Sequence, residues 1–233
     1  SPTLFHALGR DNEIAAIDRT AIRAAREAIS KVAEKPVAVA GSFSLMREVV
    51  NGSDRTVLPN INRDVATDLV ERKAEGLAES GCDLIIMEMM RDADLSVVAT
   101  EAAVATGLPV WVGISVERRD DGRLIGFDTP DWTLEDITSV LMAIGAQACC
   151  VMHHDAALTR EALSIIQSIW AGSVGAYPES GTFKMPNWEF GDITPEEFAR
   201  LCKEWRRLGT SILGGCCGIG PEHIAALSKA FNK

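Results

Sequence analysis

Short apolar segments alternate along the chain with longer segments whose apolar residues recur at helical spacing. The short segments are rich in Val and Ile, which is typical of strands buried on both faces. They cover residues 37–41, 84–87, 110–114, 148–152, 173–177 and 211–213. The longer segments predict helices with one apolar face. They cover residues 14–29, 66–77, 95–105, 159–169 and 198–208.

Two helix starts support this alternation. Thr133 stands three residues before Asp136, and Thr194 is followed by Pro195 and Glu197. The second start has an N-cap residue, a first-turn proline and a capping-box acid in order. Repeating strand–helix units imply a parallel sheet covered by helices. We therefore expect an α/β fold of the (β/α)8 TIM-barrel type.

The barrel is expected to lack two strands. Six strands are predicted, whereas a closed barrel has eight. The helix at residues 14–29 has no strand before it, and the chain begins with Ser-Pro instead of an initiator Met. We expect a single barrel domain over residues 1–233 that contains strands 3 to 8, with the first two strands missing. Residues 41–65 and 178–191 fall on the active-site rim. The second of these segments is a candidate lid, although an ordinary surface loop fits either one equally well.

Composition narrows the classes of function. The chain has 233 residues, a hydrophobic fraction of 47% and a net charge of -10. That charge argues against a general nucleic-acid binder and against binding to an anionic membrane, so a small-molecule substrate fits better. No apolar run approaches the ~18 residues of a spanning helix, and no secretory signal is visible, which favours the cytoplasm. The composition leaves open whether the protein forms a homo-oligomer.

The six cysteines include two adjacent pairs, which suit metal or thiol chemistry better than a disulfide framework. The second pair lies in the segment Leu-Gly-Gly-Cys-Cys-Gly-Ile-Gly-Pro-Glu-His-Ile, residues 213–224. This segment ends a strand, turns on glycines and starts a helix at Pro221. The positive end of a helix favours thiolates at Cys216 and Cys217, and thiolates bind zinc. The alternative is a pair of buried cysteines that act as small apolar residues.

The whole segment resembles the closing signature of the homocysteine S-methyltransferase family, Gly-Gly-Cys-Cys-Gly followed by Pro-x-His-Ile. The resemblance extends along the chain. Residues 177–181, Tyr-Pro-Glu-Ser-Gly, are similar to the family's Tyr-Pro-Asn-Ser-Gly, and residues 52–54 to its Gly-Ser-Glu. Residues 87–89 and 107–112 resemble the family's Glu-Thr strand end and its next strand. The family's opening Asp-Gly-Gly and Thr-Asn strand ends do not occur here, in agreement with two missing strands.

This resemblance implies a set of site residues. Cys216 and Cys217 would be zinc ligands, Glu88 would act in catalysis by holding the amino group of the thiol substrate, and Tyr177 and Ser180 would also bind substrate. The family's third ligand is the cysteine of a Gly-x-Asn-Cys segment, and counting from the preceding helix places His153 there. Cys150 is the rival if the register of the strand differs. We expect His154 to be exposed or to be an outer hydrogen-bond donor, and Cys82, Cys149 and Cys202 to lie in the core.

The implied activity is zinc-dependent methyl transfer from a sulfonium, ammonium or corrinoid donor to a small thiol such as homocysteine, through a zinc-bound thiolate. Zinc is needed because a free thiol, with a pKa of ~8.5, is mostly protonated at neutral pH. Four aromatic residues are candidates for a face toward a cationic donor. They are Trp111, Trp132, Tyr177 and Trp188. Two alternatives stay open: a zinc hydrolase or lyase of the same fold, and a non-catalytic zinc- or thiol-binding protein whose cysteine pair is a redox pair.

Overall fold

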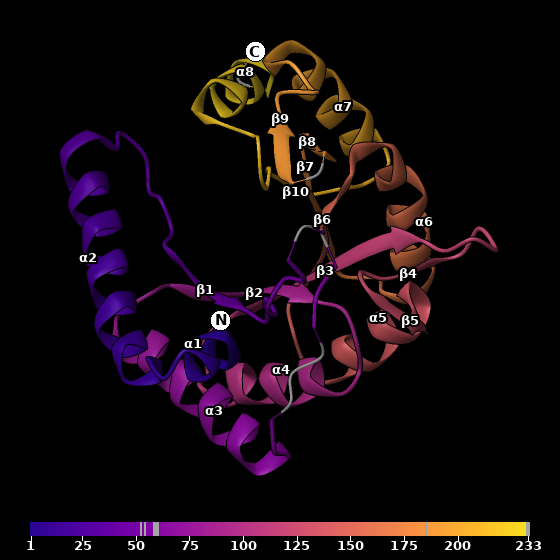
Figure 1. Cartoon of the computed structure of the whole chain (residues 1–233). Helices are drawn as coiled ribbons and strands as arrows, with labels where there is room; N and C mark the ends of the chain where they lie inside the picture. Colours follow the sequence, from indigo (N-terminus) through magenta and orange to yellow (C-terminus); the bar gives the residue numbers. More distant parts are fainter. Residues whose placement is uncertain (52, 54, 58–60, 185, 232–233) are drawn as a thin grey trace.

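Six parallel strands form the central sheet, and they follow one another in chain order. The computed structural model describes residues 1–51, 53, 55–57, 61–184 and 186–231. The six strands are β1 (Ala40–Ser44), β2 (Leu84–Met90), β3 (Val110–Arg118), β6 (Ala148–Asp155), β7 (Ser173–Glu179) and β10 (Ile212–Leu213). Their order in the sheet is β1-β2-β3-β6-β7-β10. The sheet curves into an arc with β1 and β10 at its two ends (Figure 1).

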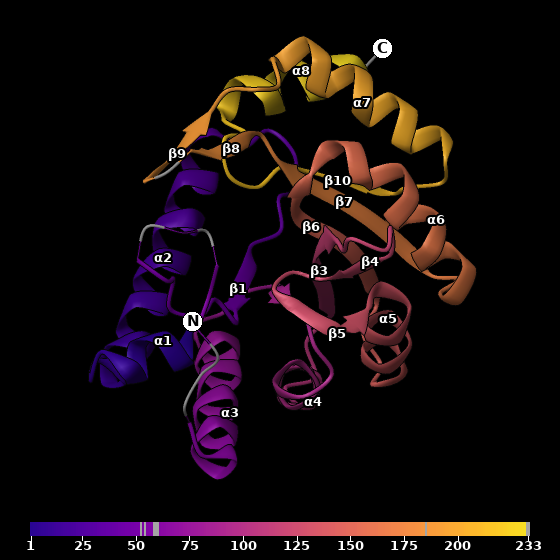
Figure 2. The ribbon, with the colours of Figure 1, turned by 45° about the vertical axis from the view of Figure 1, so that its right-hand side comes forward.

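Helices cover the outer face of this arc (Figures 1 and 2). They are α2 (Ile14–Val32), α3 (Arg63–Glu79), α4 (Leu95–Ala105), α5 (Leu134–Ala143), α6 (Thr159–Ile169), α7 (Pro195–Arg207) and α8 (Pro221–Phe231), with short pieces α1 (Pro2–Ala7), η1 (Asp11–Glu13) and η2 (Ala156–Leu158). The predicted helix starts are confirmed, since the side chains of Thr133 and Thr194 accept hydrogen bonds from the backbone of Asp136 and Glu197. The parallel strands in chain order and the helices that alternate with them confirm the expected α/β fold of the barrel type.

Two antiparallel hairpins interrupt the strand–helix alternation, and the hydrophobic pattern did not predict either. The first joins β4 (Leu124–Gly126) to β5 (Thr129–Thr133) and pairs with the long end of β3. The second joins β8 (Gly181–Lys184) to β9 (Asn187–Phe190) within the candidate lid segment. Both follow the carboxyl ends of barrel strands, so both stand on the rim where active sites of this fold lie.

The buried residues form two groups on opposite sides of the sheet. The larger group packs the sheet against the helices and includes Phe198 and Trp205. A smaller group inside the arc contains Met89, Cys150 and Tyr177, with Cys216 at its border. Because side chains alternate between the two faces of a strand, Cys149 faces the helices and Cys150 faces the interior.

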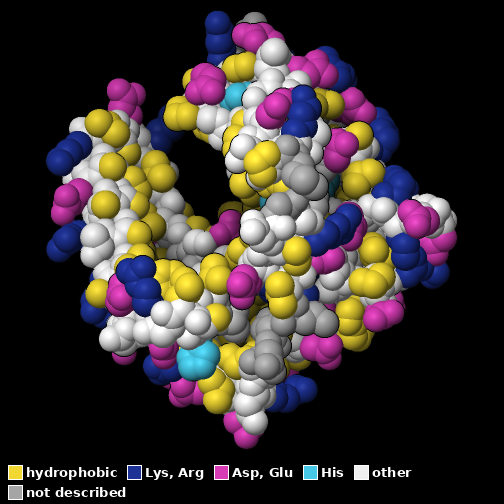
Figure 3. Space-filling view, viewed as in Figure 1, with side chains coloured by type: hydrophobic (Ala, Val, Ile, Leu, Met, Phe, Trp, Pro, Cys, Tyr) yellow, Lys and Arg dark blue, Asp and Glu magenta, His cyan; other side chains and the backbone are white. Residues whose placement is uncertain are grey.

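One helix stands apart from the rest of the outer layer. In α2, only Ile22 is buried. An ion pair between Lys73 Nζ and Asp18 Oδ2, 2.6 Å apart and nearly excluded from solvent, ties α2 to α3. Hydrophobic side chains on α2 border a hollow between α2 and the C-terminal helices (Figure 3). The arc is therefore open on one side in the described part of the chain.

Candidate metal centre and active site

The two adjacent cysteines lie in a tight loop between β10 and α8. The backbone N–H of Cys216 donates to the carbonyl of Pro178, and the carbonyl of Cys217 accepts from Ser180, both at 2.8 Å. Gly218 has a φ of +77°, and a Cβ there would lie 2.0 Å from the carbonyl oxygen of Ser180. Only glycine combines that backbone conformation with so close an approach. The loop is thus fastened to the end of β7.

His153 lies at the carboxyl end of β6, at an irregularity in the strand. The register between β6 and β7 shifts between Met152 and Asp155, and His153 adopts a left-handed φ of 44°. Such a conformation is uncommon for a side chain larger than glycine and recurs at functional sites. The ring of Phe127 meets the imidazole edge to face at 5.4 Å, and Trp188 of β9 lies 6.2 Å away. The irregular backbone at His153 therefore directs the imidazole toward the rings of Phe127 and Trp188, in a partly exposed site.

The structure brings His153, Cys216 and Cys217 together. One potential ligand atom from each lies within 4.8 Å of the other two. The two sulfur atoms are 3.9 Å apart. Two thiols and an imidazole at these distances are a donor set that suits Zn²⁺ and leaves a fourth position open. This is the only such cluster of three His, Cys, Asp or Glu side chains within the described residues.

The pKa values in this cluster are displaced in opposite directions. Hydrogen bonds from the Cys216 thiol and from His153 lower the pKa of Cys217 to about 4. The neighbouring Cys217 sulfur and burial raise the pKa of Cys216. Burial lowers the pKa of His153, but the nearby Cys217 and Glu179 raise it further, so that it ends above its ordinary value. These shifts favour a thiolate on Cys217, and the thiolate is the form that binds metal.

Cys150, the rival for the third ligand, lies deeper in the strand. Its side chain is fully buried, and burial raises its pKa to about 12. Its sulfur packs against the backbone of Gly175, where a Cβ would lie 2.4 Å away. Cys150 does not belong to the cluster that His153 forms with the two later cysteines. The other expected core cysteines, Cys82, Cys149 and Cys202, are also buried.

The predicted substrate residues occupy three different settings. Glu88 is half-buried at the end of β2, where its Oε2 accepts a hydrogen bond from Ser42 Oγ at 2.5 Å. Tyr177 is buried inside the arc, and its hydroxyl makes no hydrogen bond within the described residues. Burial, together with the charges of Cys150 and Glu88, raises its pKa well above the ordinary value. Both side chains border the interior beneath the cysteine pair.

Ser180 is 1% exposed and serves the local structure. Its Oγ accepts from the backbone N–H of Ile193 at 2.8 Å, and its own N–H donates to the carbonyl of Cys217. Ser180 thus links the segment that follows the β8–β9 hairpin to the cysteine loop. A direct contact with substrate stays a prediction for this residue.

His154 differs from expectation. It is 2% exposed, and its Nε2 lies 2.8 Å from Thr159 Oγ1. Burial lowers its pKa to about 3. The expectation that His154 is exposed is wrong, because η2 and the start of α6 cover the ring.

Sequence reasoning also overlooked Glu179, whose Oε2 lies 3.1 Å from Nδ1 of His153. The glutamate in the Tyr-Pro-Glu-Ser-Gly segment, where the family's pattern has asparagine, was the available signal.

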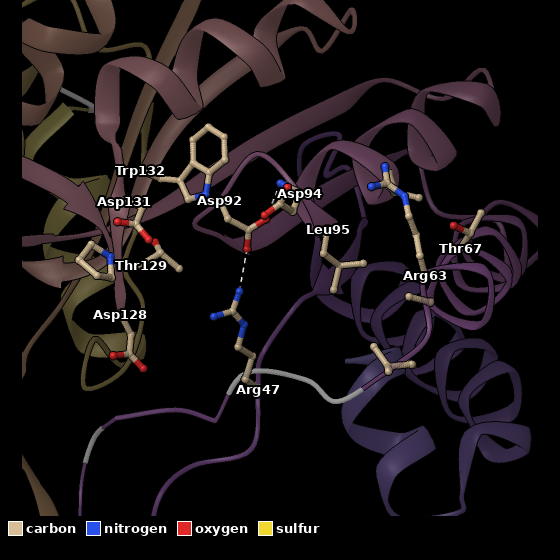
Figure 4. A pocket seen from close by; sticks show the side chains of 14 residues that line it. Arg47, Arg63, Thr67, Asp92, Asp94, Leu95, Asp128, Thr129, Asp131 and Trp132 are labelled. Carbon is tan, nitrogen blue, oxygen red and sulfur yellow. Dashed lines mark hydrogen bonds and ion pairs between the residues drawn. The ribbon is translucent and has the colours of Figure 1, made fainter.

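A separate pocket of about 590 Å³ opens between the starts of α3 and α4 and the β4–β5 hairpin. Figure 4 shows its charged lining, in which the buried side chains of Arg47 and Asp92 are paired at 2.7 Å beside Trp132. None of the residues that line it belongs to the cysteine–histidine cluster.

Of the other predicted aromatic residues, Trp111 is the second residue of β3, at the strand end opposite the rim. Among the predicted tryptophans, only Trp188 has a ring contact with the cluster in the described structure.

Within the described residues, no helix combines the length and the hydropathy that a membrane span requires.

Comparison with solved structures finds the homocysteine methyltransferase MmuM from Escherichia coli. Its metallated form matches with a TM-score of 0.71 and 19% identity over 98% of this chain and 75% of that one, and its apo form with 0.65 and 20% over 93% and 75%. At this identity the likeness establishes the fold.

Sequence comparison adds the family. A selenocysteine methyltransferase from Astragalus bisulcatus is 24% identical over an alignment of 216 positions that covers 85% of this chain and 60% of that protein. The chain thus spans about three fifths of this relative. The sequence pattern described as homocysteine S-methyltransferase matches residues 3–231, nearly the whole length. The chain therefore belongs to the homocysteine S-methyltransferase family.

Proposed function

We propose that this protein is a zinc-dependent S-methyltransferase that moves a methyl group from a sulfonium, ammonium or corrinoid donor to a small thiol such as homocysteine. The observation that supports this proposal is the cluster of His153, Cys216 and Cys217, with ligand atoms within 4.8 Å of one another on the barrel rim. Membership in the family supports methyl transfer to a small thiol. MmuM, which shares the fold, has been solved in a metallated form, and this supports a bound metal.

The donor set of the cluster fits zinc better than magnesium or calcium. Two cysteine sulfurs and one imidazole nitrogen are soft and borderline ligands, whereas the harder ions take oxygen. Zinc bound there would lower the pKa of a substrate thiol and so supply a nucleophile at neutral pH. The lowered pKa of Cys217 supports the same assignment, because it favours the thiolate form that binds zinc.

The chain's own residues would then position the reacting groups. Glu88 would hold the ammonium group of the amino acid thiol with a carboxylate that Ser42 already orients. Tyr177 would offer its buried hydroxyl from below the cysteine pair, and Ser180 would hold the cysteine loop and border the substrate. Trp188 and Phe127 flank the imidazole and would exclude water on the side from which a cationic donor approaches. Positioning of this kind supplies much of the acceleration of an in-line displacement.

Two broader proposals accompany this function. The six strands would correspond to strands 3 to 8 of an eight-stranded barrel, because they are parallel, consecutive and bounded by β1 and β10. A reducing, cytoplasmic setting would keep the cysteine pair available to metal, since all six cysteines are free thiols.

The decisive experiment measures metal binding by ligand variants. We expect the purified chain to take up one zinc ion, and His153→Ala and Cys217→Ser to lose affinity by at least about 10-fold. Cys150→Ala is the matched control and should keep the affinity of the parent chain. In a cobalt-substituted sample, homocysteine should change the sulfur-to-cobalt absorption. A chain that binds no zinc, or one whose affinity depends on Cys150 and not on His153, would refute the assignment.

A further inference from the structure

Glu179 and His153 form a mostly buried acid–imidazole pair, and His153 belongs to the cluster with the two cysteines. Nδ1 of His153 lies 3.1 Å from Oε2 of Glu179, and the two side chains are 13% and 11% exposed. Glu179 is the last residue of β7, and His153 lies on the neighbouring strand β6. Two strands of the sheet thus present the pair to the rim in a fixed relation.

The contact determines which ring nitrogen is available to a metal. A neutral imidazole carries its proton on one nitrogen and can ligate only through the other. At 3.1 Å the contact is a close charge contact without hydrogen-bond geometry. The negative charge beside Nδ1 favours a proton on that nitrogen over a lone pair, and the lone pair is then on Nε2. In metal sites, such carboxylate partners orient the ligating histidine and make it a better donor.

The contact also supplies charge. Two thiolates, a neutral imidazole and a divalent ion are together neutral, and the carboxylate of Glu179 adds one negative charge close to the cluster. Three thiolates with the same ion would carry that same charge. The acid therefore compensates electrostatically for an imidazole in place of a third sulfur.

We propose that Glu179 is a positioning residue that makes His153 a metal ligand, by fixing its tautomer and by restoring the negative charge of the site. This inference rests on the proposed function, because it presupposes a metal on His153, Cys216 and Cys217. It assigns Glu179 no contact with substrate. The backbone around His153 supports the role, since a left-handed φ of 44° gives the ring a direction that a regular strand would not give it.

The test measures zinc affinity, by competition with a chromophoric chelator, in a set of variants. Glu179→Ala removes the carboxylate and its charge and should weaken zinc binding about 10–100-fold. Glu179→Gln keeps a polar side chain of the same size but loses the charge, and it should fall between Glu179→Ala and the parent chain. The matched control is Glu222→Gln, because Glu222 Oε1 also lies beside a histidine Nδ1, that of His223 at 3.4 Å, but outside the cluster. Its zinc affinity should not change.

A second background separates this role from a structural one. In His153→Cys, the third ligand has no tautomer and brings its own charge, so adding Glu179→Ala should leave zinc affinity unchanged or increase it. The cobalt spectrum of Glu179→Ala should shift in the parent background only. An equal loss in both backgrounds would show that Glu179 merely supports the fold, and an unchanged affinity in the parent background would refute its role. If the parent chain takes up no zinc, the metal site itself fails, which is a different result from a zinc-loaded chain that ignores Glu179.

Discussion

Gly218→Ala tests whether the close fit of the cysteine loop against β7 is essential. Gly218 has a φ of +77°, and a Cβ would lie 2.0 Å from the carbonyl oxygen and 2.9 Å from the carbonyl carbon of Ser180. The left-handed conformation costs a non-glycine residue about 1–2 kcal/mol. Overpacking adds about 1–3 kcal/mol, because the atoms that must move are backbone atoms. We therefore expect a loss of about 2–5 kcal/mol in the free energy of unfolding.

The same change should weaken metal binding. To reach ordinary contact, the loop must move away from Ser180 by more than about 1 Å, which stretches the 2.8 Å hydrogen bond between Ser180 N and the carbonyl of Cys217. Cys217 precedes Gly218 and would move with it. We expect a reduced zinc affinity in addition to the reduced stability.

Gly107→Ala is the matched control. Gly107 also has a φ of +77°, but a Cβ there would meet nothing within 4 Å. It should cost only the conformational part, about 1–2 kcal/mol, and leave zinc binding unchanged. Urea unfolding in the presence of a chelator gives the stability of each variant, and chelator competition gives its zinc affinity. Equal losses of stability in the two variants would refute the steric argument, and an unchanged zinc affinity in Gly218→Ala would refute the coupling.

Three further predictions concern buried polar groups. The pKa of His154 is lowered to about 3, below about 6.5 in the unfolded chain, so the unfolded state binds more protons between these values and stability is lost as the pH falls through this window. From about pH 6.5 to about pH 4.5 the parent chain without metal should lose about 2 kcal/mol more than His154→Gln, as urea titrations would show. Tyr177→Phe removes a buried hydroxyl that has no partner within the described residues and should stabilise by about 1–3 kcal/mol, so a lower urea midpoint would contradict it. Asp18→Ala leaves the buried ammonium of Lys73 unpaired and should cost about 3–5 kcal/mol, with faster proteolysis within α2; unchanged proteolysis would contradict the anchoring role of the pair.

Hydrophobic patterning could predict most of the sheet, because both faces of its strands are buried. Strands β2, β3, β6 and β7 begin at the predicted residues, 84, 110, 148 and 173, and continue beyond the predicted ends. The extensions mix apolar and polar residues on the rim, among them Glu117 and Asp155, so the continuous apolar pattern ends before the strands do. The first strand begins three residues later than predicted, since the apolar residues 37–39 precede the ladder with β2. The hairpins could not be predicted because Thr129–Thr133 and Asn187–Phe190 are largely exposed and carry no buried alternation.

The candidate site could be predicted only where its residues belong to one recognisable stretch of sequence. Cys216 and Cys217 are adjacent in a recognisable segment, and the count from the preceding helix led to His153. The partners of the imidazole come from other strands, and no spacing in the sequence relates them to it. Glu179 lies on β7 and Phe127 follows β4, so only the folded sheet brings them to His153. The burial of His154 depends likewise on η2 and α6, which fold over the strand end.

The outermost position of β10 has a kinetic consequence. This strand consists of two residues and pairs with β7 alone in the described part of the chain. Short edge segments fray at a small fraction of the free energy needed to unfold a whole domain. Since Leu213 leads within three residues to the cysteine pair, fraying would release two of the three candidate ligands at once. Metal exchange should therefore follow the local opening rate of this edge and remain rapid even when the rest of the sheet is strongly protected.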